Sequence, residues 1–359
     1  MSDYTRLIAI ELARAGDVVN VWAPSCGLAD PIDDGVAVHR LPGHFGPRAI
    51  ALLDRQLNRN PGRILVQYVP HAFGFKAMNF PFVSWLYARR SANITVMFHE
   101  VAYPVAASQS LKHNLLGVAT QKMAAIVARA AGRIFVSTSS WESQLRAISG
   151  TVKPIVSLPV PSNLSVVEDC TAVNAIRRRH WPVEGPIVGH FGTYGDSIAE
   201  LLDGILPAIL VDVPQASAFL IGRNSELYRE RLIGRNPQLG RRVAATGILG
   251  ERDASSHISA CDLMLQPYPD GISTRRTSAM VALAHGRAVA TTSGHLTEPL
   301  WAESGAVAIS PVNEPLENAR LAGGLLLDAK YRKQLGSAGR ALYQSKFQIS
   351  NTVAALRAA

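Results

Sequence analysis

The sequence has 359 residues, and this length predicts two domains, because a single hydrophobic core rarely grows beyond about 250 residues. Its composition, 48% hydrophobic and 18% charged, excludes a disordered or low-complexity chain, and no uncharged apolar run approaches the roughly 18 residues that span a bilayer. The net charge of +9 indicates an anionic partner, which could be a nucleotide, an anionic membrane face or nucleic acid.

The start of the sequence and its cysteines indicate the compartment. Residues 1–4 lack the basic and apolar regions of a signal peptide, so we expect a cytoplasmic protein. Cys26, Cys170 and Cys261 are odd in number and far apart, so neither a disulfide framework nor a zinc site is expected. The basic residues form scattered pairs and triplets without an RNA-binding or helix-turn-helix pattern, so we expect no nucleic acid partner.

Short β-branched runs alternate with longer helical stretches along the chain, which predicts parallel sheets built from βαβ units. After a first helix over 4–15, the first half is expected to form strands at 18–22, 36–41, 64–69, 94–98, 134–136 and 155–158. The second half is expected to form strands at 187–191, 218–221, 243–246, 263–266, 288–291 and 306–309. The predicted fold class is therefore α/β, with two Rossmann-like, doubly wound parallel sheets.

Residues that break regular structure gather between the two halves and predict the domain boundary there. We expect a Rossmann-like domain over 1–160, a linker over 161–183, a second domain over 184–330, and a helical tail over 331–359 that packs back on the first domain.

Ligands of open α/β sheets bind outside the carboxyl ends of the strands, so the residues after each strand are the functional candidates. In the first half these are 70–71, 99–100 and 137–140. In the second half they are 192–195, 222–223, 247–248, 268–271 and 292–294.

The segment 262–292, DLMLQPYPDGISTRRTSAMVALAHGRAVATT, carries the strongest signal. A buried strand is followed by a turn at Gly271, and Ser273 and Thr274 are expected to cap a helix whose N-terminus can bind an anion. Arg275 and Arg276 would then lie in the first helical turn, where each cation opposes the helix dipole by about 0.3 to 1 kcal/mol. A bound diphosphate would account for them; the alternative is that they point into solvent or pair with nearby carboxylates.

This segment resembles the donor site of GT-B glycosyltransferases of family four. These are retaining enzymes in which two glutamates separated by seven residues precede a helix continuing AMA-x-G-x-PVVA. Asp270 occupies the first acidic position and Ser278 the second, followed by Ala279, Met280 and the stretch 286–290. The resemblance implies that Asp270 contacts the donor sugar, while Ser278 replaces the acid that holds the ribose. The family's Arg and Lys after the first strand of the second domain are replaced by 192–195.

The resemblance extends over nearly the whole chain. Residues 243–262 resemble the family's base-binding stretch, which implies that the backbone of Gly247 and Ile248 contacts the nucleobase. His99 and Glu100 match a His-Asp-like pair, which implies that His99 touches the donor sugar; the alternative is a structural histidine in a strand-end turn. The helix over 4–15 resembles the family's first helix, which follows a strand and a glycine-rich loop. This sequence opens at that helix, so either its start has been placed late or the fold lacks an edge that it normally has. As it stands, the first domain is expected to lack that strand and to expose the sheet edges beside it.

The resemblance implies a GT-B protein whose two domains face each other across a cleft. The expected activity is metal-independent, retaining hexosyl transfer from a nucleotide-diphosphate sugar to a glycan or lipid-linked acceptor, in bacterial polysaccharide or glycolipid synthesis. The nucleotide sugar is a co-substrate, and no further cofactor and no metal are expected. The catalytic candidates are His99 and Asp270, and the acceptor-side candidates are His71, Lys76 and Glu100. The donor-binding candidates are Gly192, Thr193, Arg223, Gly247, Ile248, Gly271, Ser273, Thr274, Arg275, Arg276, Ser278 and Glu298.

Residues 73–90 interleave aromatic side chains with cations, which suits contact with anionic lipid at the inner face of the membrane but is also typical of a core. Two other functions stay open. A catalytically dead GT-B-like binding or scaffold protein would account for the replaced acid. A Rossmann dehydrogenase is disfavoured because no G-x-G-x-x-G follows a first strand.

Overall fold

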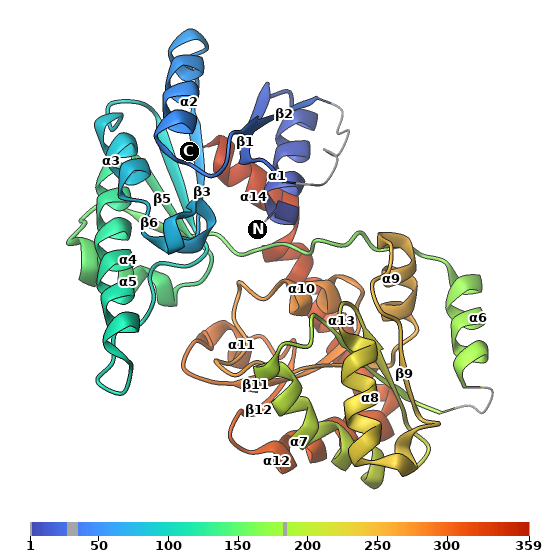
Figure 1. The fold of residues 1–359 in the computed structure, drawn as a ribbon. Coiled ribbons are helices and arrows are strands. Elements are labelled where there is room, and N and C mark those ends of the chain that lie inside the picture. Colours follow the sequence, from blue (N-terminus) through green and yellow to red (C-terminus); the bar gives the residue numbers. More distant parts are fainter. Residues whose placement is uncertain (1, 27–34, 182–184, 359) are drawn as a thin grey trace. The chain divides into compact units, whose positions relative to one another are not determined.

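The computed structural model describes residues 2–26, 35–181 and 185–358, which divide into two compact units (Figure 1). Unit 1 comprises Met1–Pro159 and Ile349–Ala359, and unit 2 comprises Val160–Gln348. The segment 161–183, expected to be a linker, belongs to unit 2 and contains a helix, α6 (Cys170–His180). Asp169 caps this helix by accepting a hydrogen bond from the Ala172 N–H. Residues 182–184, where we expected the linker to end, lie outside the described residues.

Unit 2 contains a six-stranded parallel sheet in the order β12-β11-β10-β7-β8-β9. Its strands are β7 (Ile187–Phe191), β8 (Ser217–Ile221), β9 (Val243–Ala245), β10 (Leu263–Gln266), β11 (Ala288–Ser293) and β12 (Ala308–Pro311). Numbered within the unit, this order is 6-5-4-1-2-3, the doubly wound Rossmann arrangement in which the winding reverses between the first and fourth strands. The reversal lies between β7 and β10.

Helices cover both faces of this sheet, which is why most residues of its strands are buried. They are α7 (Asp196–Asp212), α8 (Ser225–Arg235), α9 (Glu251–Ser259), α10 (Thr277–Ala284), α11 (Pro299–Glu303), α12 (Pro315–Leu327) and α13 (Ala329–Leu342), with short turns η3 (Pro237–Leu239) and η4 (Tyr343–Phe347). One core packs α7, α8 and α12 on the face that carries Val188 and Leu265. The other packs α9, α10 and η4 on the face that carries Met264 and Val289.

Unit 1 divides its strands between two parallel sheets. The first pairs β1 (Val19–Pro24) with β2 (Val36–Leu41). The second has the order β3-β4-β5-β6, from β3 (Ile64–Tyr68), β4 (Ile94–Phe98), β5 (Arg133–Val136) and β6 (Ile155–Ser157). The combined order β2-β1 and β3-β4-β5 matches the order in unit 2 with its central first strand left out.

The helices of unit 1 are α1 (Ser2–Arg14), α2 (Pro47–Arg59), α3 (Phe80–Ala88), α4 (Leu111–Ala130), α5 (Ser140–Ser149) and α14 (Ile349–Arg357), with short turns η1 (Pro70–Phe73) and η2 (Phe75–Ala77). The main core joins α2, α3, α4 and α5 to the larger sheet. The end of the predicted tail lies in this unit, where Arg63 donates a hydrogen bond to the Leu356 carbonyl at 2.5 Å and Arg357 pairs with Asp17 at 3.3 Å. The twelve predicted strands are all present, with ends that shift by two residues at most.

Candidate functional site

The candidate donor residues of unit 2 follow the carboxyl ends of neighbouring strands. Because the sheet order is β11-β10-β7-β8-β9, the loops after these strands form one row. The row runs from Gly294 through Asp270, Gly192 and Gly222 to Gly247. Ligands of doubly wound sheets bind where the winding reverses, which here is between the loops of Asp270 and Gly192.

Asp270 lies at the centre of a cluster with the two adjacent arginines. Its carboxylate accepts a hydrogen bond from Arg275 Nη2 at 2.6 Å and a second from Arg276 Nη2. The Arg276 guanidinium also stacks over the Tyr268 ring, 4.6 Å from its centroid, and the Tyr268 hydroxyl lies 2.8 Å from Ser278 Oγ. The structure thus brings together both arginines, Asp270 and Ser278.

The expected cap of the following helix is wrong. Helix α10 begins at Thr277 with Arg276 as its N-cap residue, so the two arginines precede the helix and do not lie in its first turn. Thr274 is held elsewhere: its N–H and its hydroxyl both donate to the Glu298 carboxylate, at 2.9 and 2.5 Å. Glu298 also accepts a hydrogen bond from Trp301 Nε1 at 2.9 Å. Glu298 therefore fixes the arginine-bearing loop from 24 residues away in the sequence.

Glycines allow the loops after β10 and β11 to touch. Gly271 has a φ of +85°, and a Cβ placed there would lie 2.3 Å from the Gly294 N. A side chain at Gly294 would in turn approach the Asp270 backbone to 2.6 Å. The Leu296 N–H donates to the Asp270 carbonyl at 2.9 Å, so the backbone of the acid is fixed by the neighbouring loop.

The loops after β7 and β8 approach each other in the same way. Gly222 has a φ of +115°, and a Cβ there would lie 2.3 Å from the Gly192 carbonyl oxygen. Thr193 and Arg223 are both exposed at this edge. Gly192 and Arg223 therefore lie at the ends of the neighbouring strands β7 and β8.

His190 is a buried residue of this edge that the sequence analysis did not identify. Its Nδ1 donates to the Leu265 carbonyl at 2.8 Å, across the point where the winding reverses. Its Nε2 has no hydrogen-bond partner within the described ranges, and a Cβ at Gly192 would lie 3.0 Å from that nitrogen. Burial lowers the pKa of His190 to about 4, so the imidazole is neutral at neutral pH.

The expected base-binding residues follow β9. The Gly247 N–H donates to Ser225 Oγ at 2.9 Å, so it is already engaged within the protein. Ile248 is exposed beside it. Of these two residues, Gly247 is therefore buried and Ile248 is exposed to solvent.

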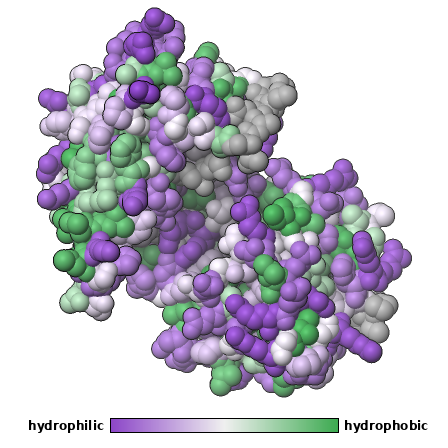
Figure 2. All heavy atoms as spheres, in the orientation of Figure 1, coloured by the Kyte–Doolittle hydropathy of each residue, from purple (hydrophilic) through white to green (hydrophobic). Residues whose placement is uncertain are grey.

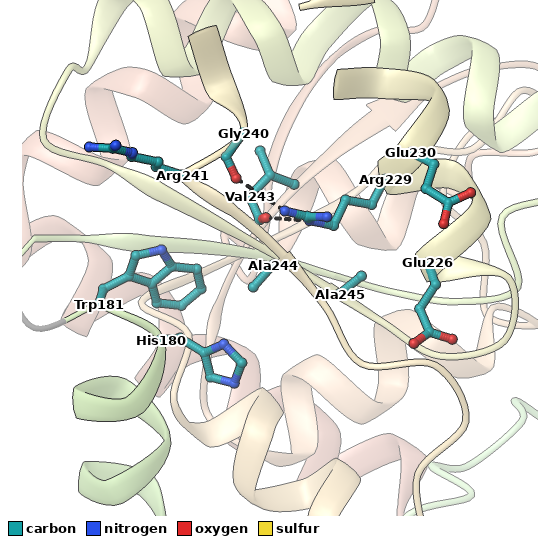
Figure 3. A pocket seen from close by; sticks show the side chains of 10 residues that line it. All are labelled: His180, Trp181, Glu226, Arg229, Glu230, Gly240, Arg241, Val243, Ala244 and Ala245. Atoms are coloured by element: carbon teal, nitrogen blue, oxygen red, sulfur yellow. Dashed lines mark hydrogen bonds between the residues drawn. The ribbon is translucent and has the colours of Figure 1, made fainter. Parts of the chain in front are cut away.

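A hollow of about 420 Å³ lies along β9 (Figure 3). Its lining includes His180, Trp181, Glu226 and Arg229. The Arg229 guanidinium lies against the strand and donates to the carbonyls of Val243 and Gly240, at 2.6 and 3.1 Å. None of the predicted donor residues lines this hollow.

In unit 1, His99 follows β4 and is held on several sides. Its carbonyl accepts hydrogen bonds from Trp141 Nε1 at 2.8 Å and from Ser137 Oγ at 3.2 Å. Its Nε2 lies 2.8 Å from Gln67 Oε1, and Tyr4 packs edge-on against the ring with centroids 4.6 Å apart. Burial lowers the pKa of His99 to about 3, so the ring is neutral at neutral pH. With Gln67 Oε1 as acceptor, the proton lies on Nε2 and the lone pair on Nδ1.

The acceptor-side candidates lie at the same edge of unit 1. His71 Nδ1 lies 3.9 Å from Glu100 Oε2, and both side chains are exposed. Lys76 is exposed in η2. The structure therefore brings His71 and Glu100 together.

The aromatic run 73–90 divides between core and surface. Phe73 and Phe82 are buried, and their rings stack with centroids 4.3 Å apart. Trp85 donates from Nε1 to Asp54. Phe75, Phe80 and Tyr87 are exposed.

No three His, Cys, Asp or Glu side chains in the described ranges gather so that they could hold a metal ion. Of the helices described, none combines the length and the apolar composition needed to cross a membrane.

Solved structures with the same architecture cover almost the whole chain, although neither a protein-family model nor a curated protein matches the sequence. Sucrose-phosphate synthase from Thermosynechococcus elongatus superposes with a TM-score of 0.73 at 18% identity, covering 98% of this chain and 90% of that one. The chain has the GT-B fold. HepE from Anabaena, solved in complex with UDP-glucose, gives a TM-score of 0.67 at 16% identity and covers 99% and 94%. WaaG, a glycosyltransferase of lipopolysaccharide biosynthesis, gives 0.67 at 14% identity and covers 98% and 94%. At these identities the GT-B similarity establishes the fold alone.

Proposed function

We propose that this GT-B chain is a glycosyltransferase that takes a sugar from a nucleotide-diphosphate donor bound by unit 2. The observation that carries the proposal is the cluster of Arg275, Arg276 and Asp270 beside the reversal point of the unit 2 sheet. Guanidinium groups are suited to phosphate oxygens because they offer several N–H donors in one plane. The UDP and UDP-glucose complexes of HepE support a donor of this class.

The row of strand ends fits the length of such a donor. Neighbouring strands lie about 4.8 Å apart, so the ends of β9 and β10 are separated by three steps, or about 14 Å. This span is comparable with an extended nucleoside diphosphate. We assign the base to Ile248, since the Gly247 N–H is engaged, and the diphosphate to Arg275, Arg276, Arg223 and the Gly192–Thr193 backbone.

The chemistry proposed for this site is retaining hexosyl transfer without a metal. Arginines preorganised by Asp270 stabilise the negative charge that develops on the leaving diphosphate. Asp270 contacts the sugar hydroxyls through the remaining lone pairs of its carboxylate. The neutral imidazole of His99 hydrogen-bonds the donor sugar, and the acceptor attacks from the side of the leaving group.

The acceptor is assigned to unit 1, near His71, Lys76 and Glu100. We propose a glycan or a lipid-linked sugar, used in bacterial polysaccharide or glycolipid synthesis at the inner face of the membrane. The involvement of WaaG in lipopolysaccharide biosynthesis supports this class of acceptor.

A second candidate is a GT-B-like binding protein without activity. Two observations favour it: Ser278 replaces the second acid, and two guanidiniums already engage the Asp270 carboxylate. Such a protein would bind nucleotide sugars without turnover.

Ligand-induced stabilisation followed by a turnover assay distinguishes the two. Melting curves are recorded with UDP, ADP, GDP and their glucose conjugates, since a ligand at one hundred times its Kd stabilises by about 2.7 kcal/mol. Release of the diphosphate is then measured with the stabilising donor, with and without EDTA, and the anomeric configuration of the product is read by NMR. Stabilisation without release supports the binding protein, and no stabilisation by any nucleotide contradicts both.

A further inference from the structure

Hydrogen bonds join the loops that follow β8 and β9 in unit 2. The Gly222 N–H, after β8, donates to Thr246 Oγ1 at 3.3 Å. The Gly247 N–H, after β9, donates at 2.9 Å to Oγ of the fully buried Ser225, which is the first residue of α8. The first turn of α8 is therefore held in a fixed position beside the loop to which we assign the base.

The carboxylate of Glu226, in this first turn, lies against Gly247. A Cβ placed on Gly247 would lie 2.8 Å from Glu226 Oε2, so the carboxylate fills the space that a side chain at this position would need. Gly247 also has a φ of +67°, which residues other than glycine rarely adopt. Glycine in this loop thus allows the carboxylate of the neighbouring loop to lie beside the base position.

The Glu226 side chain is exposed, and within the described part of the chain its carboxylate forms no hydrogen bond or ion pair. The next basic residue of the helix, Arg229, donates to two backbone carbonyls instead. An acidic residue in the first turn of a helix ordinarily serves to interact favourably with the helix dipole. That role does not require the carboxylate to lie on the adjacent loop, and so it does not account for the contact with Gly247.

An apolar side chain and a hollow adjoin this carboxylate. Ile248, the residue after Gly247, is 71% exposed and offers an apolar surface to one face of a planar ring. The hollow of about 420 Å³ along β9 reaches the same loop, because Glu226 and Ala245 both line it (Figure 3). Sites for small ligands have volumes of about 300 to 1,000 Å³. Figure 2 shows apolar side chains only in small patches on the surface of unit 2 around α8, which suits a small ligand better than a broad apolar partner.

A carboxylate distinguishes the bases by the hydrogen-bond donors along their edges, because its two oxygens only accept. Guanine offers two adjacent donors, the N1–H and the 2-amino group, which match the two oxygens at once. Adenine and cytosine offer one amino group beside a ring nitrogen that accepts. Uracil offers one N–H between two carbonyls, whose lone pairs repel a carboxylate. Of these four bases, only guanine pairs with both oxygens of a carboxylate.

We propose that Glu226 makes the donor site selective for guanine, so that the donor is a GDP-sugar. The two carboxylate oxygens accept hydrogen bonds from the guanine N1–H and 2-amino group, and Ile248 packs on one face of the ring. This inference rests on the proposed donor site of unit 2, to which it adds the identity of the base. Glu226 determines specificity and takes no part in the transfer step.

Calorimetric titration of the full chain with GDP, inosine diphosphate, ADP, CDP and UDP tests the proposal. GDP should bind roughly tenfold or more tightly than ADP, CDP and UDP, as expected for one bidentate pair with a base. Inosine diphosphate keeps the N1–H but lacks the 2-amino group, so its affinity should lie between those of GDP and UDP. Glu226→Gln replaces one acceptor oxygen by an N–H donor. This variant should lose most of the preference for GDP and bind UDP more tightly than the unchanged chain does, because an amide matches the N3–H and a carbonyl of uracil.

The matched control is Glu230→Gln, the same substitution at an exposed position one turn further along α8, which should keep the preference for GDP. Melting temperatures of both variants detect a purely structural effect, since loss of a first-turn carboxylate lowers helix stability without changing the choice of base. UDP or ADP binding to the unchanged chain as tightly as GDP overturns the inference and leaves the donor site in place. A preference for GDP that Glu226→Gln retains also overturns it. Absence of binding by all five nucleotides overturns the proposed function and this inference together.

Discussion

The sheets of the two units differ at the place where a doubly wound sheet has its centre. In unit 2, β7 fills that place, and β8 and β10 beside it are fully buried. In unit 1 the strands on either side, β1 and β3, are edge strands within the described part of the chain. No residue of β1 is fully buried, and β3 buries only Val66 and Tyr68. A central strand therefore does more than add its own hydrogen bonds, because it determines the burial of both neighbours.

This comparison predicts that truncation of a strand residue to alanine has a much larger effect in unit 2 than in unit 1. Leu265→Ala in β10 removes a buried side chain and should lower the free energy of unfolding of unit 2 by about 2 to 5 kcal/mol. Val21→Ala in β1 removes a half-buried side chain and should lower the free energy of unfolding of unit 1 by less than about 1 kcal/mol. Urea titration with hydrogen-exchange readout on peptides of each unit measures both. A loss at Val21 as large as at Leu265 would show that β1 is shielded as a central strand is.

The proposed donor site extends the comparison, because the cluster of Asp270, Arg275 and Arg276 belongs to unit 2. Arg275→Ala and Arg276→Ala should each weaken binding of a nucleoside diphosphate by about 1.5 to 3 kcal/mol, since each removes a charge-assisted hydrogen bond to phosphate. Binding of the nucleoside should change little. Isothermal titration with UDP and uridine, or with the base that stabilises best, measures both. Arg252→Ala, which removes an exposed pair with Asp169 on the same unit, is the matched control. Equal losses for nucleotide and nucleoside would place the phosphates elsewhere.

The strands were predictable because their signal is local. Runs such as Ile94–Phe98 and Leu263–Gln266 carry apolar residues on both faces, as is typical of strands buried between helix layers. The start of α10 was predicted wrongly because a distant residue decided it. Ser273 and Thr274 look like caps in sequence, yet Thr274 binds Glu298, which only the fold brings near. Local propensity was overridden by a tertiary hydrogen bond.

The surface of unit 1 was only partly predictable. The aromatic residues of 73–90 predicted either contact with anionic lipid or a core. Composition alone does not distinguish the buried Phe82 from the exposed Phe75. The exposed apolar side chains at the start of α4 were not predicted, although Leu111, Leu115 and Val118 have helical spacing. That spacing is equally typical of a core-facing helix, and only the packing of Gly117 and Met123 shows which side is covered.

Each unit also holds a neutral histidine at a strand end, His99 in unit 1 and His190 in unit 2. Their folded-state pKa values, about 3 and about 4, lie below the unfolded value near 6.5. The unfolded chain therefore binds protons that the folded chain does not, so stability is full above pH 6.5 and falls as the pH drops toward those values. At pH 5.5 each group destabilises the fold by up to about 1.4 kcal/mol. His99→Gln and His190→Gln should each reduce the loss between pH 7 and 5.5 in their own unit, measured by urea titration with hydrogen-exchange readout. An unchanged acid dependence in both variants would contradict their being neutral and buried.

The smallest expected effect is that of substituting His99, which should lower turnover without changing nucleotide binding. His99 belongs to unit 1, so His99→Ala should leave nucleotide affinity unchanged while lowering kcat by up to about tenfold, the value of one hydrogen bond of about 0.5 to 1.5 kcal/mol. Gln67→Leu keeps the imidazole but removes the acceptor that fixes its Nε2, so it should lower kcat by less than His99→Ala does. Calorimetry gives the affinity, and diphosphate release gives the rate. Because Tyr4 packs on the ring, the melting temperature of both variants is recorded to detect loss of folding. If nucleotide affinity falls in step with kcat in His99→Ala, the histidine acts through the donor-binding unit, and the assignment of the donor sugar contact to unit 1 must be abandoned.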